Sequence, residues 1–127
     1  MRLRVGIDLV AVDEVEEAVR VHSGRYLRRV YTRRELSDCA SAAGTPDARR
    51  LAARFAAKEA AAKALGTGIS HGVSWLEIEV GRQPGGRPIL ALSGRAAERA
   101  REMGVVRVSL SLTHSRETAM AVVVMEG

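Results

Sequence analysis

An alanine-rich run between Pro46 and Gly66 constrains the fold of this chain more than any other segment. Proline is tolerated in the first turn of a helix and glycine often ends one, so the run predicts a long helix that is capped by Thr45 and ends near Leu65. Aromatic residues make up only 3% of the chain, so the core around this helix must be built mainly from Ala, Val and Leu. Because small side chains bury little area each, we expect oligomerisation to bury further surface.

Alternation of apolar and polar residues predicts strands before and after this helix. Residues 3–9 alternate with period two, which predicts a half-buried strand with Asp8 on the face opposite the core. Residues 76–80 and 88–92 are expected to form two more strands joined by a glycine-rich turn. Residues 106–113 and 118–125 predict a hairpin, in which the second strand is apolar on both faces and therefore buried.

Capping signals predict three shorter helices. Asp13 followed by Glu16 resembles a capping box, and the helix that starts there should break at Ser23. Thr32 repeats the signal with Glu35 three residues later. A further helix is expected over residues 93–103.

Length and composition predict one globular domain over residues 1–127, with 46% hydrophobic and 28% charged residues. Cys39 is the sole cysteine, which excludes an intramolecular disulfide and fits the reducing cytoplasm. The sequence has no apolar run typical of a signal peptide or a membrane span, so a cytoplasmic protein is expected. The net charge of +5 favours an anionic partner, such as a phosphate ester, an acidic protein or a nucleic acid.

Charged residues gather on the alanine-rich helix. Glu59 and Lys63 are spaced i, i+4 and share a face, with Arg54 and Lys58 alongside. This pattern is typical of a solvated helix face, but it also fits a phosphate site in which the carboxylate holds a metal ion. Asp8 is a candidate second carboxylate, although an aspartate in this context is also typical of a turn or a cap.

Polar residues near the C-terminus give a weaker signal. His114 ends a predicted strand whose polar face carries Ser111 and Thr113. A histidine there is either a satisfied structural group or a catalytic base. The Gly66-Thr67-Gly68 loop lacks the following Lys-Ser/Thr of a P-loop, so by itself it is weak evidence for a phosphate cradle.

Four segments match one known family in order and spacing over nearly the whole chain. They are Gly6-Ile7-Asp8-Leu9-Val10, Tyr26-Leu27-Arg28-Arg29-Val30-Tyr31-Thr32 with Glu35-Leu36, the block from Leu51-Ala52-Ala53-Arg54-Phe55-Ala56-Ala57-Lys58-Glu59-Ala60 through Lys63-Ala64-Leu65-Gly66-Thr67-Gly68, and Ser109-Leu110-Ser111-Leu112-Thr113-His114-Ser115. The third block is highly specific and the others are individually modest. The chain resembles the small, acyl-carrier-protein-synthase type of 4'-phosphopantetheinyl transferase.

The resemblance implies an α+β fold in which an antiparallel sheet packs on a long central helix, and a homotrimer with an active site at each subunit boundary. Asp8 and Glu59 match the family's magnesium ligands, and Lys63 matches the lysine that contacts the diphosphate. The residues that match regions lining coenzyme A are Arg54, Lys58, Lys63, Gly66, Thr67, Gly68, Pro88, Ser111, Thr113 and His114.

The implied reaction is attack by a serine hydroxyl of an apo acyl carrier protein on the β-phosphate of coenzyme A, which expels adenosine 3',5'-bisphosphate. A magnesium ion on Asp8 and Glu59 would stabilise the developing charge, and Lys63 would assist the leaving phosphate. The base is either Glu59 or a water on the metal. The carrier would serve fatty-acid or polyketide biosynthesis.

The first helix departs from the family pattern. Family members present basic residues there to an acidic carrier, whereas this helix begins with the acidic residues Asp13, Glu14, Glu16 and Glu17. These carboxylates would repel an acidic partner, so an altered carrier preference is expected. The basic residues that remain for carrier binding are Arg20, Arg25, Arg28 and Arg29.

Two alternatives come from other functional classes. A nucleic-acid-binding module would need a contiguous basic face with stacking aromatics, but the four aromatic residues are widely separated in the sequence. A non-catalytic carrier-protein-binding relative would have no need to keep Asp8, Glu59 and Lys63 together. The enzyme is therefore the favoured interpretation.

Overall fold

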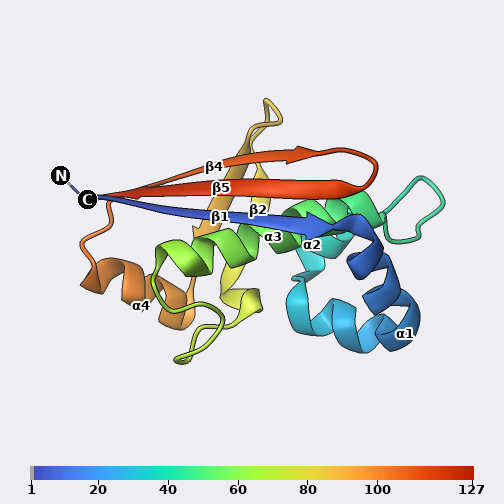
Figure 1. Cartoon of the computed structure of the whole chain (residues 1–127), viewed down its shortest axis with the longest axis horizontal. Coiled ribbons are helices and arrows are strands. Elements are labelled where there is room, and N and C mark those ends of the chain that lie inside the picture. Colours follow the sequence, from blue (N-terminus) through green and yellow to red (C-terminus); the bar gives the residue numbers. More distant parts are fainter. Residues whose placement is uncertain (1) are drawn as a thin grey trace.

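A three-stranded antiparallel sheet runs along the long axis of the molecule (Figure 1). The computed structural model describes residues 2–127. The sheet contains β1 (Leu3–Ala11), β5 (Thr118–Glu126) and β4 (Arg107–His114) in that spatial order. Strand β5 is central, so that Val122 lies opposite both Ile7 and Ser111. The predicted C-terminal hairpin is confirmed.

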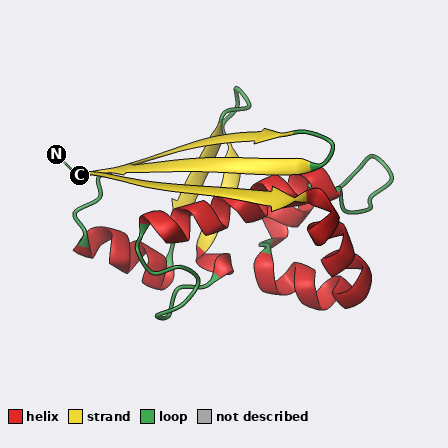
Figure 2. Ribbon diagram, in the orientation of Figure 1, coloured by secondary structure: helices red, strands yellow, loops and turns green. Residues whose placement is uncertain are grey.

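Helix α3 (Ala48–Ala64) covers one face of this sheet, here called the inner face, while no helix of the described residues covers the opposite outer face (Figure 2). The alanines of α3 are buried because the strands approach the helix closely. At the crossing with β1, a Cβ on Gly6 would overlap the carbonyl oxygen of Ala60. Glycine at this position therefore sets the distance between β1 and α3.

The cap of α3 differs from the prediction. Asp47, and not Thr45, caps the helix, and its side chain accepts hydrogen bonds from the backbone N–H groups of Arg49 and Arg50 at 3.0 and 3.3 Å. Pro46 lies outside the helix because it forms an isolated bridge with Ala40. The extended backbone at Pro46 moves the start of the helix beyond it.

Helix α1 (Val12–Val30) also begins differently. It follows β1 directly, its N-cap is Ala11, and no side chain caps it, so the capping box predicted at Asp13 is wrong. The predicted break is confirmed as a kink at Ser23, which has a positive φ of 46°. Helix α2 (Arg33–Asp38) has the predicted capping box between Thr32 and Glu35.

A two-stranded sheet and two short helical elements complete the fold. Strands β2 (Ile78–Arg82) and β3 (Pro88–Leu92) pair antiparallel, and α4 (Gly94–Glu102) follows β3. The strand predicted at 76–80 starts later because Trp75–Glu77 forms a 3-10 turn, η1, with a capping box between Ser74 and Glu77.

The faces of β1 are the reverse of the prediction. Leu3, Val5, Ile7 and Leu9 point away from α3 and are 54–63% exposed. The alternate residues, including Gly6 and Asp8, face the helix, since only the glycine side of the strand fits against α3.

Strand β5 was predicted to be buried on both faces, but it is buried on one and half-buried on the other. The outer face therefore has a partly exposed apolar surface, here called the outer apolar surface. It is formed by Leu3, Val5, Ile7, Leu9, Met120, Val122 and Val124.

Candidate functional site

Asp8 and Lys63 meet where β1 crosses α3. The ammonium group of Lys63 donates to Asp8 Oδ1 at 2.9 Å and to the carbonyl oxygen of Ile7 at 3.0 Å. The Asp8 side chain is 17% exposed and that of Lys63 is 52% exposed. The reversed face of β1 explains the contact, because it turns Asp8 towards the helix. A carboxylate and a cation thus share a site that solvent can reach.

Glu59 lies one helical turn before Lys63, on the same side of α3. Its Oε1 atom accepts a hydrogen bond of 3.1 Å from the indole N–H of Trp75, the first residue of η1. Among residues 2–127, no other side chain or backbone group donates to this carboxylate. The three predicted catalytic residues, Asp8, Glu59 and Lys63, therefore gather at the C-terminal half of α3.

The donor set is suited to magnesium. Magnesium binds through one or two carboxylates together with substrate phosphates and waters, and Asp8 and Glu59 each keep one carboxylate oxygen without a hydrogen bond from the described residues. Within residues 2–127, the structure has no cluster of three or more His, Cys, Asp or Glu side chains that could hold a metal ion.

The Gly66-Thr67-Gly68 loop continues from the last turn of α3. Gly66 and Gly68 adopt positive φ angles of 79° and 62°. The backbone N–H groups of Thr67 and Gly68 donate to the carbonyl oxygen of Ala62 at 3.3 and 3.1 Å. These bonds hold the loop one turn beyond Lys63.

Lys58 does not fit the contact predicted for it. Its side chain is fully buried and its ammonium group lies 2.7 Å from Glu35 Oε1. The same group donates to the carbonyl oxygens of Trp75 and Ile78 at 2.9 and 2.7 Å. All three ammonium donors are therefore used inside the protein, which leaves none for coenzyme A. Burial lowers the pKa of Lys58, and the nearby carboxylate of Glu35 partly opposes that shift.

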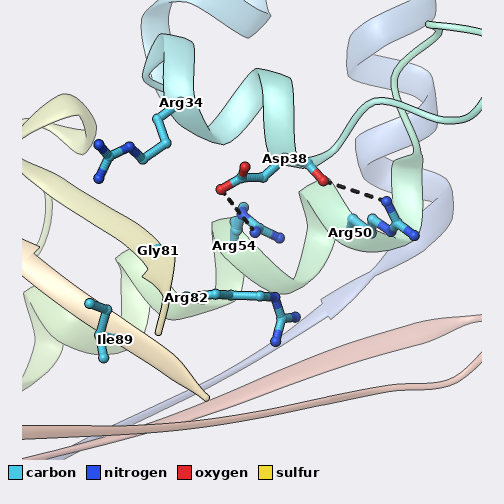
Figure 3. Close-up of a pocket in the computed structure, with 7 residues that line it drawn as sticks. All are labelled: Arg34, Asp38, Arg50, Arg54, Gly81, Arg82 and Ile89. Atoms are coloured by element: carbon cyan, nitrogen blue, oxygen red, sulfur yellow. Dashed lines mark hydrogen bonds and ion pairs between the residues drawn. The ribbon is translucent and has the colours of Figure 1, made fainter. Parts of the chain in front are cut away.

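Arg54 is also buried, but it lines a cavity of about 740 Å³ (Figure 3). Its Nε atom has no hydrogen-bond partner among residues 2–127, and its terminal nitrogen lies 3.9 Å from Asp38 Oδ2. The figure shows that the arginines around the cavity come from α2, α3 and β2. Besides Arg54 and Asp38, the lining residues are Arg34, Arg50, Gly81, Arg82 and Ile89. This excess of positive charge is suited to an anion.

The remaining coenzyme-A candidates lie elsewhere in the chain. Ser111 and Thr113 are on the outer face of the sheet, opposite Val122 and Met120 of β5. His114 is exposed at the end of β4. Pro88 begins β3 and lines a separate cavity of about 360 Å³ together with Arg87, which precedes β3, and Arg107 of β4. Because Asp8 lies on the inner face, one protomer does not bring Ser111 and Thr113 to it.

The predicted carrier-binding arginines differ in their surroundings. Arg20 pairs with Glu17 at 2.6 Å on the acidic part of α1. Arg25 and Arg28 are exposed beyond the kink. Arg29 is exposed as well, and its guanidinium carbon lies 5.8 Å from the centre of the Trp75 ring.

Sequence reasoning missed Trp75, although it is the sole tryptophan of the chain. It also missed Arg34, Arg50 and Arg82, because only the tertiary structure brings α2 and β2 to the N-terminal half of α3. The aromatic side chains pack in pairs, Tyr26 with Tyr31 and Phe55 with Trp75, and none of the four is fully exposed. They form no exposed stacking row, so the nucleic-acid alternative is not favoured.

No helix within residues 2–127 has both the length and the apolar composition needed to cross a membrane.

Proteins of known identity resemble this chain over almost its full length. A protein named holo-[acyl-carrier-protein] synthase from Koribacter versatilis (strain Ellin345) is 45% identical over 126 residues, which cover 99% of both chains. The crystal structure of Helicobacter pylori holo-[acyl-carrier-protein] synthase in complex with coenzyme A has a TM-score of 0.84 at 30% identity and covers 96% of this chain and 99% of its own. The Neisseria meningitidis holo-[acyl-carrier-protein] synthase has a TM-score of 0.85 at 34% identity, with 98% of each chain covered. Residues 4–123 also match the family profile described as the 4'-phosphopantetheinyl transferase superfamily, and the chain therefore belongs to that family.

Proposed function

We propose that this protein transfers the 4'-phosphopantetheine arm of coenzyme A to a serine of an apo acyl carrier protein. The observation that carries the proposal is the meeting of Asp8 and Lys63, 2.9 Å apart, with Glu59 one turn away on the same helix. Relatives named holo-[acyl-carrier-protein] synthase, one of them solved in complex with coenzyme A, support this activity.

The reaction exchanges one P–O bond for another. The serine oxygen bonds to the β-phosphorus of coenzyme A, and the bond between that phosphorus and the bridging oxygen breaks. The bridging oxygen leaves with adenosine 3',5'-bisphosphate, and the serine proton passes to a base. The products are the holo carrier and the bisphosphate.

Asp8 and Glu59 would hold a magnesium ion through their carboxylate oxygens. When bound, magnesium would offset the negative charge that develops on the diphosphate. Lys63 places its ammonium group beside Asp8, where a diphosphate next to that carboxylate would lie within reach of a cation. Glu59 is half-buried and one of its oxygens accepts no hydrogen bond from the described residues, so it is suited to accept the serine proton.

The arginine-lined cavity would receive a phosphate group of the nucleotide. Arg54 supports this role because it is buried and its Nε donor has no partner in the part of the chain that the structure describes. An anion in the cavity would relieve this unsatisfied donor. The Gly66-Thr67-Gly68 loop, at the other end of α3, would flank the diphosphate next to Lys63.

A homotrimer would complete the site. Ser111 and Thr113 lie on the outer face, whereas Asp8 lies on the inner face, so contact with one coenzyme A requires residues from two protomers. The outer apolar surface of β1 and β5 supports such a contact, since exposed apolar patches mark interaction sites. The long helix α3 would then be central in each protomer.

The carrier would bind along the second half of α1. Arg25, Arg28 and Arg29 are exposed there, while the first half presents carboxylates. Reversing Glu14 and Glu17 to arginine should raise kcat/KM with an ordinary fatty-acid carrier, because two repulsive charges would become attractive. An unchanged kcat/KM would contradict this account of carrier choice. We place the enzyme in the cytoplasm, where its buried free thiol, Cys39, would remain reduced.

The direct test is incubation with coenzyme A, magnesium and an apo carrier, followed by mass spectrometry of the carrier. The expected result is a carrier that has gained the mass of the phosphopantetheine arm on its serine, with adenosine 3',5'-bisphosphate released. A carrier whose serine is replaced by alanine is the matched control. An unmodified wild-type carrier would refute the proposal.

A further inference from the structure

Trp75 is placed to control the geometry of Glu59. Its indole N–H donates to Glu59 Oε1 at 3.1 Å, and this is the hydrogen bond that the described residues give to the carboxylate. Glutamate has a flexible side chain, so a half-buried glutamate on a helix face needs such a partner to keep one orientation.

The tryptophan is itself held from several directions. Its ring lies 6.2 Å from the ring of Phe55 and 5.8 Å from the guanidinium carbon of Arg29. Its carbonyl oxygen accepts a 2.9 Å hydrogen bond from the buried ammonium of Lys58. A side chain fixed in this way can impose its position on the carboxylate that it contacts.

We propose that Trp75 is a positioning residue for the transfer reaction and that its indole N–H, by binding Glu59 Oε1, leaves Oε2 as the working oxygen. The inference rests on the proposed function. Trp75 acts through Glu59 and does not itself contact the reacting groups. Asp8 is arranged in the same way, because Lys63 occupies its Oδ1 atom.

The single tryptophan makes the role testable at one atom. Production in a tryptophan-auxotrophic host with benzothienylalanine replaces Trp75 alone by an analogue of nearly the same shape, with sulfur in place of the indole N–H. A second variant, Trp75→Phe, also keeps an aromatic ring and loses the donor. Both should lower kcat roughly 10- to 100-fold, the range expected for losing a hydrogen bond to a charged group. KM for coenzyme A should stay within about twofold, because binding is not disturbed.

A spectroscopic readout tests the hydrogen bond without relying on activity. The indole N–H of Trp75 gives a single resonance in the ¹⁵N–¹H spectrum, since the chain has no other tryptophan. In Glu59→Ala this resonance should move upfield and its proton should exchange faster with solvent. The matched control is Tyr26→Phe, which removes the hydroxyl hydrogen bond of 2.8 Å to Tyr31 and should change neither kcat nor the indole resonance.

The outcomes separate the two proposals. Wild-type kcat in the benzothienylalanine protein, or an indole resonance that does not change in Glu59→Ala, would overturn the role of Trp75 while the transferase activity stands. No transfer by the wild-type protein would overturn the proposed function and, with it, the kinetic role of Trp75.

Discussion

Two lysine–carboxylate pairs lie five residues apart on α3 and have opposite surroundings. Lys58 and Glu35 are both fully buried at 2.7 Å, whereas Lys63 and Asp8 are partly exposed at 2.9 Å. Every donor of Lys58 is bonded inside the protein, while the Lys63 pair is open to solvent. The same chemical pair thus stabilises the fold in one place and forms a candidate site in the other, and solvent access makes the difference.

Replacing Asp8 by alanine should produce the largest effect. It removes a carboxylate proposed to hold magnesium, and a loss of several kcal/mol of charge stabilisation corresponds to on the order of a 10³-fold fall in kcat/KM. Formation of holo carrier, followed by mass spectrometry, measures it. Glu98→Ala, which removes an exposed carboxylate of α4, is the control and should keep normal transfer. Undiminished transfer by Asp8→Ala would show that the exposed Lys63–Asp8 pair is not part of the active site.

The buried pair should respond through stability. Glu35→Ala leaves the Lys58 ammonium buried without its carboxylate, so the free energy of unfolding should fall by roughly 3–5 kcal/mol. Urea denaturation measures this change. The double variant Glu35→Leu with Lys58→Met removes both charges and should recover a large part of the loss. A loss below about 1 kcal/mol in Glu35→Ala would show that burial is not what separates the two pairs.

The free energy of unfolding should also depend on pH through the buried thiol of Cys39. Burial raises the pKa of this thiol from 9.0 to about 11. Between these values the folded state keeps the proton that the unfolded state releases, so the stabilising contribution is complete below about pH 9 and is lost as the pH rises through 11.

The contribution of the Cys39 thiol to the free energy of unfolding should be roughly 1–3 kcal/mol. Urea denaturation from pH 8 to 11 should therefore show a steeper loss of stability for the wild type than for Cys39→Ala. The lowered pKa of Lys58 and the raised pKa of Tyr26 are present in both proteins. Burial is the main cause of the raised pKa of Tyr31 and also remains, so the difference between the two proteins reports chiefly the thiol. Parallel curves would contradict the assignment.

The smallest effect is expected for the stability of Lys63→Met. This substitution breaks a half-exposed ion pair, and such pairs contribute about 0–1 kcal/mol. Thermal unfolding should therefore be nearly unchanged although transfer is impaired. A fall in stability as large as that of Glu35→Ala would show that the exposed pair is structural after all.

Much of the fold followed from local signals. The alanine run with Gly66 beyond it, the capping box of Thr32 and Glu35 and the C-terminal hairpin were all predicted correctly. The cap at Thr45 and the start at Asp13 were wrong, because tertiary pairing at Pro46 and the direct passage from β1 into α1 outweigh local capping preferences.

The candidate site was only partly accessible from the sequence. The i, i+4 spacing placed Glu59 beside Lys63 correctly, since helical periodicity is local. The resemblance placed Lys58 among the residues that line coenzyme A, whereas the structure pairs its buried ammonium group with Glu35. Nothing in the helical spacing tells which side of an alanine-rich helix is covered. The residues that surround Arg54 and Glu59 come from α2, β2 and η1 and have no local signal in the sequence.

The sequence by itself determined the helices, the strands and the residue types from which a phosphate-transfer site can be made, because periodicity, capping and charge depend on residues that are close together in the sequence. Tertiary structure alone decided which face of β1 meets α3, and with it the contact of Asp8 with Lys63. The physical reason is a close approach: Gly6 is the residue that lets the strand lie against Ala60, and packing between distant segments overrides the apolar pattern that favoured the other face.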